Sequence, residues 1–231
     1  NLVRGGLGAR LPLAVGGLPC LGGVLGITAV SDPLVLISGD RDLPEGYGYL
    51  HVPKQRIYRF DRRWACDNGA FSGLDVAAFV TMLDTCPPTD DCLFLAVPDV
   101  VADWASTLES WARWHPRLRG YPLAIVLQDG ATIESVPWGA CAAVFIGGST
   151  RFKLSGTART IAAYALARGK WVHMGRVNGR TRFRYAASIG VQSIDGSSFS
   201  MFPDTIMAEC DAWRREGLPM SPPPMQRELE L

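Results

Sequence analysis

Residues 122–148 read PLAIVLQDGATIESVPWGACAAVFIGG. The segments 122–128 and 142–148 each begin with an apolar run and end in polar residues or glycines. Strands that are buried on both faces have this near-continuous apolar character, whereas half-exposed strands alternate between apolar and polar residues. The stretch therefore predicts two neighbouring parallel strands inside the protein.

The same pattern continues on both sides of this stretch. Apolar runs predict further strands at 33–38, 63–71, 93–97, 171–174 and 191–195. Amphipathic segments between them predict helices at 74–83, 103–115, 155–168, 181–188 and 205–216, with Asp103 and Ser155 as N-caps and Gly169 as a stop. This alternation is typical of a parallel sheet covered by helices. We expect a compact (β/α)8 TIM-like barrel whose eighth strand comes from the Gly-rich segment Asn1–Val30. A doubly wound open sheet is the alternative.

The composition of the chain limits the kinds of protein to which it can belong. The chain has 231 residues, of which 48% are hydrophobic, and its net charge is +1. We expect one catalytic domain over residues 1–218 and a Pro-rich, charged tail over 219–231. The near-neutral charge excludes a globally basic nucleic-acid binder. No apolar run reaches the roughly 18 residues of a membrane span, no signal peptide is evident, and none of the six cysteines forms a C-x-x-C pair. A cytoplasmic location, in a bacterial or phage-infected cell, is expected.

Candidate site residues lie where the predicted strands end. Parallel α/β folds place their active sites at the carboxyl ends of their strands. Turn chemistry alone also favours Asp, Asn and Gly at such positions. The clusters are Asp67-Asn68-Gly69, Pro98-Asp99, Gln128-Asp129-Gly130, Gly147-Gly148, His173-Met174-Gly175 and Asp195-Gly196.

The ordered set of motifs resembles the tRNA-guanine transglycosylase superfamily. CDNGAF at 66–71 is similar to its S-D-S-G-G-F motif, IVLQDG at 125–130 to V-Q-G-G, and VFIGGS at 144–149 to I-G-G-L-S. The stretch 172–195 resembles L-M-G-V-G followed by a helix and G-[VI]-D-M-F-D. The likeness covers about residues 60–200.

The resemblance implies a role for each matched residue. Asp195 would be the nucleophile that attacks the sugar, and Asp67 the acid/base beside the incoming base. The remaining matched positions would bind the base: Asn68, Asp99, Gln128, Gly147, Gly148, His173, Met174 and Gly175. The reaction needs a carboxylate to trap an oxocarbenium-like centre and a second acid for the leaving group.

The chain also departs from the family pattern. The family's zinc site uses three closely spaced cysteines and a histidine after the nucleophile, and only Cys210 lies there. We therefore expect no zinc subdomain, no metal and no cofactor. Ser197-Ser198-Phe199 replaces the family's P-T-R, which lies where tRNA would be gripped. The resemblance is thus greatest to the short, zinc-less, DpdA-like phage branch, which implies DNA as partner, with tRNA as the alternative, and a 7-deazaguanine base, such as the 7-cyano form.

Two groups of arginines are candidate phosphate contacts, and a solvated face explains them equally well. These are Arg62 and Arg63 before one strand, and Arg176, Arg180 and Arg182 after another. The function that the resemblance implies is exchange of guanine in DNA for a 7-deazaguanine through a covalent aspartyl–sugar intermediate. The alternatives are another α/β-barrel N-glycosidic hydrolase and a non-catalytic nucleic-acid-binding subunit. The oligomeric state is not specified by the sequence.

Overall fold

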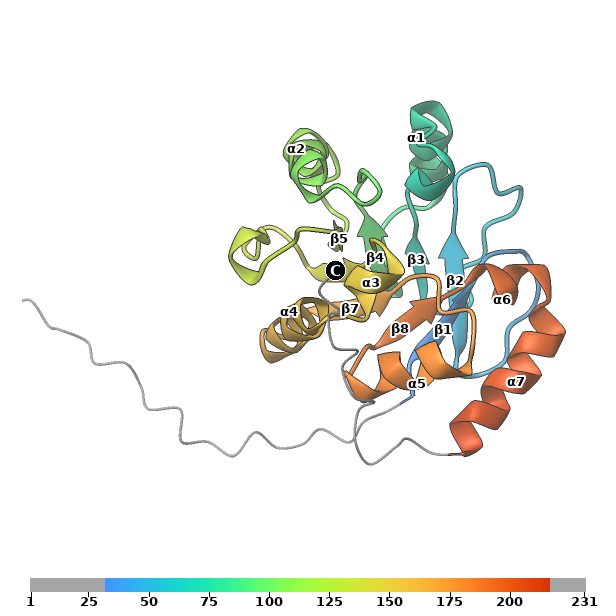
Figure 1. Cartoon of the computed structure of the whole chain (residues 1–231). Coiled ribbons are helices and arrows are strands. Elements are labelled where there is room, and N and C mark those ends of the chain that lie inside the picture. Colours follow the sequence, from blue (N-terminus) through green and yellow to red (C-terminus); the bar gives the residue numbers. More distant parts are fainter. Residues whose placement is uncertain (1–31, 217–231) are drawn as a thin grey trace, which may run out of the picture.

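Eight parallel strands form a closed barrel in the computed structural model, which describes residues 32–216 (Figure 1). Each strand pairs with its neighbours in sequence, and β1 closes the ring by pairing with β8. The predicted (β/α)8 barrel is therefore confirmed. The strands are β1 Leu34–Ile37, β2 Tyr47–His51, β3 Trp64–Cys66, β4 Cys92–Ala96, β5 Leu123–Leu127, β6 Ala143–Ile146, β7 Trp171–Met174 and β8 Ser193–Asp195.

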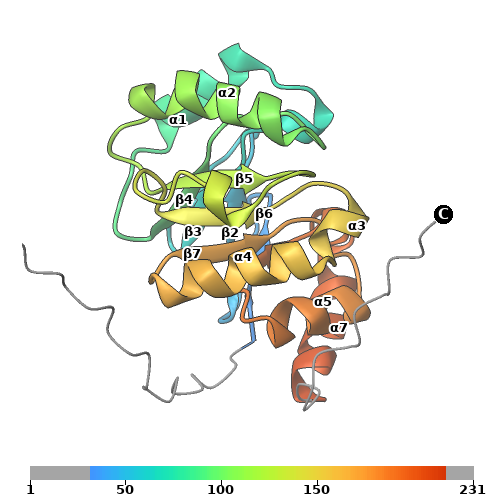
Figure 2. The same cartoon turned by 60° about the vertical axis from the view of Figure 1, so that its left-hand side comes forward.

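Helices surround the barrel. Figure 2 shows α1 and α2 on one side of the strands, and α4, α5 and α7 on the other. The α-helices are α1 Val76–Thr85, α2 Trp104–Trp114, α3 Thr150–Lys153, α4 Gly156–Ala167, α5 Arg180–Ser188, α6 Ser197–Met201 and α7 Pro203–Arg215. The short 3-10 helices are η1 Ala70–Ser72, η2 His115–Arg117 and η3 Ile133–Ser135.

Local side-chain chemistry fixes where two of the helices begin. The Asp103 side chain accepts a hydrogen bond from the backbone N–H of Ser106, and the Ser155 side chain accepts one from Ala158. Such bonds satisfy backbone donors that have no partner within the first turn. Gly169, just after α4, has a φ of +66°, which favours glycine at a helix end. Both predicted N-caps and the predicted stop are thus confirmed.

The strands separate two apolar layers. Side chains such as Leu36, Phe94 and Phe145 fill the barrel interior, and their chain neighbours face the helices. Burial on both faces explains why the strands read as continuous apolar runs. The five cysteines in residues 32–216 are free and buried within this structure. None of the helices in that range has both the length and the apolar character needed to cross a membrane.

The source of the eighth strand was predicted wrongly. The strand is β2, which reads YGYLH and was not recognised in the sequence, and all five of its residues are buried. Gly48 interrupts its apolar pattern, and glycine weakens strand signals because it has no side chain to pack. The expected strand within Asn1–Val30 and the expected tail at 219–231 lie outside the described residues.

Candidate active site

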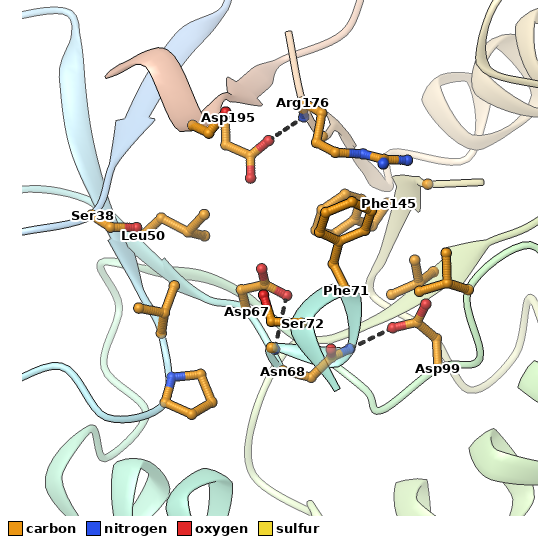
Figure 3. Close-up of a pocket in the computed structure, with 18 of the residues that line it drawn as sticks. Ser38, Leu50, Asp67, Asn68, Phe71, Ser72, Asp99, Phe145, Arg176 and Asp195 are labelled. Atoms are coloured by element: carbon orange, nitrogen blue, oxygen red, sulfur yellow. Dashed lines mark hydrogen bonds between the residues drawn. The ribbon is translucent and has the colours of Figure 1, made fainter. Parts of the chain in front are cut away.

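A cavity of about 440 Å³ opens at the carboxyl ends of the strands (Figure 3). Asp67, Asp99 and Asp195 line it, together with Lys153 and Arg176. Its size lies within the range of small-molecule sites. The structure thus brings three of the predicted carboxylates to one end of the barrel, because parallel strands all end on the same rim.

Asn68 joins the ends of β3 and β4. Its Nδ2 donates to the Val97 carbonyl at 3.0 Å and to Asp99 Oδ1 at 2.8 Å, and its Oδ1 accepts from the Ala70 N–H at 2.7 Å. The residue is only 1% exposed. A buried amide with its polar atoms satisfied is rigid, so Asn68 positions Asp99 rather than reacting itself.

Gln128 holds Asp99 from the other side. Its Nε2 donates to Asp99 Oδ2 at 2.5 Å, while its Oε1 accepts from the Ala102 N–H at 2.8 Å. Burial raises the pKa of Asp99 to about 6, and the negative charge of Asp67 contributes to this rise. The hydrogen bonds from Asn68 and Gln128 oppose the rise. Asp99 is therefore a fixed carboxylate whose charge varies near neutral pH.

Asp195 faces Asp67 across the cavity (Figure 3). Burial and the charge of Asp67 raise the pKa of Asp195 to about 6, against a hydrogen bond from the Arg176 N–H at 2.5 Å and the positive charge of Lys153. Burial also raises the pKa of Asp67, in spite of hydrogen bonds from the Gly69 and Asn68 backbone. Two such carboxylates can exchange roles as proton donor and acceptor.

Lys153 was not among the residues predicted from the sequence. It ends the short helix α3, which follows β6, and it is 5% exposed. Its Nζ donates to the Gly175 carbonyl at 2.7 Å. Burial lowers the pKa of its amine to about 7, and the positive charges of Arg176 and Arg182 contribute to this shift. The negative charge of Asp195 opposes the shift. The rarity of lysine in this chain is the one sequence signal that could have drawn attention to Lys153.

Three predicted glycines line the cavity, and packing explains two of them. A Cβ on Gly147 would lie 2.8 Å from Val126 Cγ1 and 2.9 Å from the Leu127 carbonyl, and a Cβ on Gly175 would overlap the Phe145 ring. Gly148, also on the cavity wall, has a φ of +69°. Glycine at these positions lets the backbone approach its neighbours closely.

Three other strand-end residues do not line the cavity. His173 is fully buried inside the barrel, where it packs against Phe94 and Phe145, and Met174 is 1% exposed. Asp129 binds Ser149 through both of its oxygens, at 2.7 Å to the backbone N–H and 2.5 Å to Oγ. The first two were predicted to bind substrate. Residue order at a strand end does not reveal which side chain points into the cavity.

The predicted arginines do not form one patch. Arg176 lines the cavity, its guanidinium donates to the Gly148 carbonyl at 2.6 Å, and it lies 4.3 Å from the centre of the Phe71 ring. Arg182 donates to the Arg176 carbonyl, and Arg180 pairs with Glu216.

The other two predicted arginines precede β3, at the amino ends of the strands. Arg62 donates to the Leu43 carbonyl at 3.1 Å. Arg63 lies 4.9 Å from the Trp171 ring, at the start of β7. Arg62 and Arg63 therefore lie away from the cavity that Arg176 lines. A role of these five arginines as phosphate contacts stays a prediction.

Backbone strain is concentrated around this cavity. Among residues 32–216, the non-glycine residues with left-handed φ are Lys54, Ala102 and Arg176. Lys54 and Arg176 line the cavity, and the N–H groups of Ala102 and Arg176 bind Gln128 and Asp195. Such conformations cost about 1–3 kcal/mol each and persist where the surrounding structure holds them, often at functional sites. In the part of the chain that is described, no three metal-ligating side chains cluster, and the expected absence of a metal stays a prediction.

Comparison with known proteins gives few matches. No protein-family model and no curated protein matches the chain. Two solved structures of mandelate racemase/muconate lactonizing enzymes from Roseovarius nubinhibens ISM do match. The first, complexed with magnesium, is 21% identical with a TM-score of 0.35 and covers 61% of this chain and 38% of its own. The second is 20% identical with a TM-score of 0.39 and covers 73% and 54%. This chain spans about half or less of their length, and no residue role follows from them.

The predicted membership of the tRNA-guanine transglycosylase superfamily is therefore wrong. Family models and curated sequences do not support it, and the structures that match are racemase or lactonizing enzymes. The predicted exchange of guanine through an aspartyl–sugar intermediate is therefore wrong as well. The two alternative functions, an N-glycosidic hydrolase and a non-catalytic binding subunit, are not supported either. DNA and 7-deazaguanine as partners lose the same support.

Short Asp/Gly motifs in phase are weak evidence because every parallel barrel places turn residues at its strand ends. Neither matching structure is described as a glycosyltransferase.

Proposed function

We propose that this protein is an enzyme that catalyses proton transfer on a small polar substrate, with Asp67 and Asp195 as its acid–base pair. The observation that carries the proposal is the pairing of these two carboxylates across one cavity. Each has a raised pKa, and the charge of Asp67 contributes to the shift at Asp195. A general acid or base works best when its pKa lies near the operating pH.

The surroundings support this role. The strained backbone at Arg176 places its N–H on Asp195 Oδ1, which fixes the orientation of this carboxylate at the cavity wall. Asp99, held by Asn68 and Gln128, supplies a third carboxylate for orienting donor groups of the substrate. Rigid placement of this kind is what acid–base catalysis requires.

Proton exchange with solvent tests the proposal without a known substrate. The protein would be incubated in D2O with a panel of small carbonyl, hydroxy and amino compounds, and loss of C–H signals would be followed by proton NMR. We expect at least one compound to exchange, with Asp67→Asn and Asp195→Asn each slowing the exchange by about 10²–10⁴-fold.

Asp129→Asn is the matched control, because Asp129 also follows a strand but binds Ser149 instead of lining the cavity. It should exchange at the native rate if it folds. Exchange that survives in Asp195→Asn, or no exchange with any compound, would count against proton transfer by this pair.

A further inference from the structure

Lysine is rare in this chain, and its placement is informative. The sequence contains three lysines, Lys54, Lys153 and Lys170, against twenty arginines. Arginine stays charged at all ordinary pH values, whereas a buried lysine can lose its proton. Two of the three, Lys54 and Lys153, line the cavity. Lys54 is exposed and pairs with Asp75 at 2.8 Å, whereas Lys153 is buried, so Lys153 is the lysine whose nitrogen can titrate.

The surroundings of Lys153 keep its amine accessible to a ligand but largely out of water. The side chain lines the cavity although the residue is 5% exposed. Nζ donates one hydrogen to the Gly175 carbonyl at 2.7 Å. A neutral amine that donates one hydrogen keeps its lone pair for an electrophile, and the bond to a backbone carbonyl fixes where that nitrogen sits.

The neighbouring charges favour the neutral amine. Arg176 and Arg182 lie close enough to lower the pKa of Lys153, in addition to its burial, and Asp195 only partly opposes them. Desolvation and adjacent cations are the two ways in which proteins make a lysine nucleophilic. At a pKa of about 7, a large fraction of the amine is unprotonated at neutral pH.

We propose that Lys153 captures the carbonyl group of a small aldehyde or ketone as an imine within this cavity. This rests on the proposed proton-transfer function and names its substrate class. The Nζ lone pair attacks the carbonyl carbon, the C–N bond forms, and the carbonyl oxygen takes up a proton. Nitrogen then loses a proton to a carboxylate, and the hydroxyl group leaves as water after receiving a second proton. The net change is amine plus carbonyl plus one proton, supplied by the acid form of a cavity carboxylate, to protonated imine plus water.

An imine at Lys153 would create the acidic C–H bond on which the carboxylate pair acts. A protonated imine withdraws electrons from the adjacent carbon and makes its C–H bond acidic. One carboxylate of the Asp67–Asp195 pair, facing the same cavity, can then take that proton. The pair and Lys153 would thus act in sequence on one substrate.

Reductive trapping tests the capture directly. The native protein would be treated at pH 7 with limiting propanal and cyanoborohydride, and the labelled lysines located by peptide mass spectrometry. We expect Lys153 to be labelled at least about ten-fold faster than Lys54 or Lys170, because burial and the charge of Arg176 lower the pKa of its amine. Lys170 is a matched reference, since its Nζ also donates to a backbone carbonyl, that of Cys141 at 2.6 Å, but it lies just before β7 at the other end of the barrel.

Two variants separate this inference from the proposed function. Asp195→Asn should still be labelled at Lys153 although it loses C–H exchange. Lys153→Met should lose exchange of aldehydes and ketones, whereas Lys170→Arg should keep it. Labelling of Lys54 or Lys170 as fast as Lys153 overturns the imine, even if exchange by the carboxylate pair persists. Labelling of Lys153 without any exchange supports the imine and removes the proton-transfer function instead.

Discussion

Asp195→Asn is expected to make the protein more stable at pH 7.5 while it removes proton transfer. The fold raises the pKa of Asp195 from 3.8 to about 6, mainly through burial. At pH 7.5 the charged carboxylate therefore opposes folding, by up to about 3 kcal/mol for a shift of this size. Asparagine keeps an oxygen for the Arg176 N–H without the charge. Part of the gain is lost because Lys153 loses its partner charge, so we expect a net gain of about 1–2 kcal/mol.

The pH dependence has a definite sign. Because its folded-state pKa is raised, Asp195 binds a proton more readily in the folded than in the unfolded state. Native stability should therefore rise relative to the variant as the pH falls from about 6 to 3.8, and the difference should vanish below that range. Thermal unfolding of both proteins between pH 7.5 and 3.5 measures this.

Asp129→Asn provides the opposite case. Burial raises the pKa of Asp129, but hydrogen bonds from Ser149 outweigh it and leave the pKa below its usual value. Its charge therefore favours folding at neutral pH, and its replacement should destabilise. An Asp195→Asn variant that is less stable than the native protein at pH 7.5 would show that the charged form of Asp195 does not oppose folding.

Gly48→Ala is expected to have the largest effect on folding. Gly48 lies in the middle of β2, and a Cβ there would overlap the backbone carbonyl of Arg63 and lie 3.1 Å from Leu36 Cδ2. A paired backbone cannot move aside as a flexible side chain can, so we expect a loss of about 3 kcal/mol in the free energy of unfolding. Urea denaturation measures it.

Gly139→Ala is the matched control for this variant. A Cβ at Gly139 would meet no atom within 4 Å, so stability should be unchanged or slightly higher. If both variants unfold at the same urea concentration as the native protein, β2 is not packed against β3 as described.

Much of the barrel could be predicted from the sequence because burial on both faces leaves continuous apolar runs. The strand order follows from the alternation with helices, and Asp103 and Ser155 mark helix starts by side-chain chemistry. Strand β2 was missed because Gly48 and two tyrosines do not resemble an aliphatic core strand. Its glycine reflects contact with β3, a tertiary constraint that a local pattern does not reveal.

The candidate site was only partly predictable. Asp67, Asp99 and Asp195 share one cavity because parallel strands end together. His173 and Met174 end a strand as well, but they are buried away from the cavity. Lys153 lies in a helix after β6, and only the three-dimensional structure shows that it reaches the cavity. The chemistry of the site could not be taken from motif order, since the same residues serve ordinary turns.

The central claim is that Asp67 and Asp195 face one cavity and that the charge of Asp67 raises the pKa of Asp195. Carbon-13 NMR of protein labelled at the aspartate carboxyl carbons measures this directly, with Asp67→Asn, Asp99→Asn and Asp195→Asn used for assignment. We predict that the Asp195 carboxyl titrates at about 6 and that its pKa falls in Asp67→Asn, because a negative neighbour has been removed. An Asp195 carboxyl that titrates near 3.8, unchanged in Asp67→Asn, would contradict the claim.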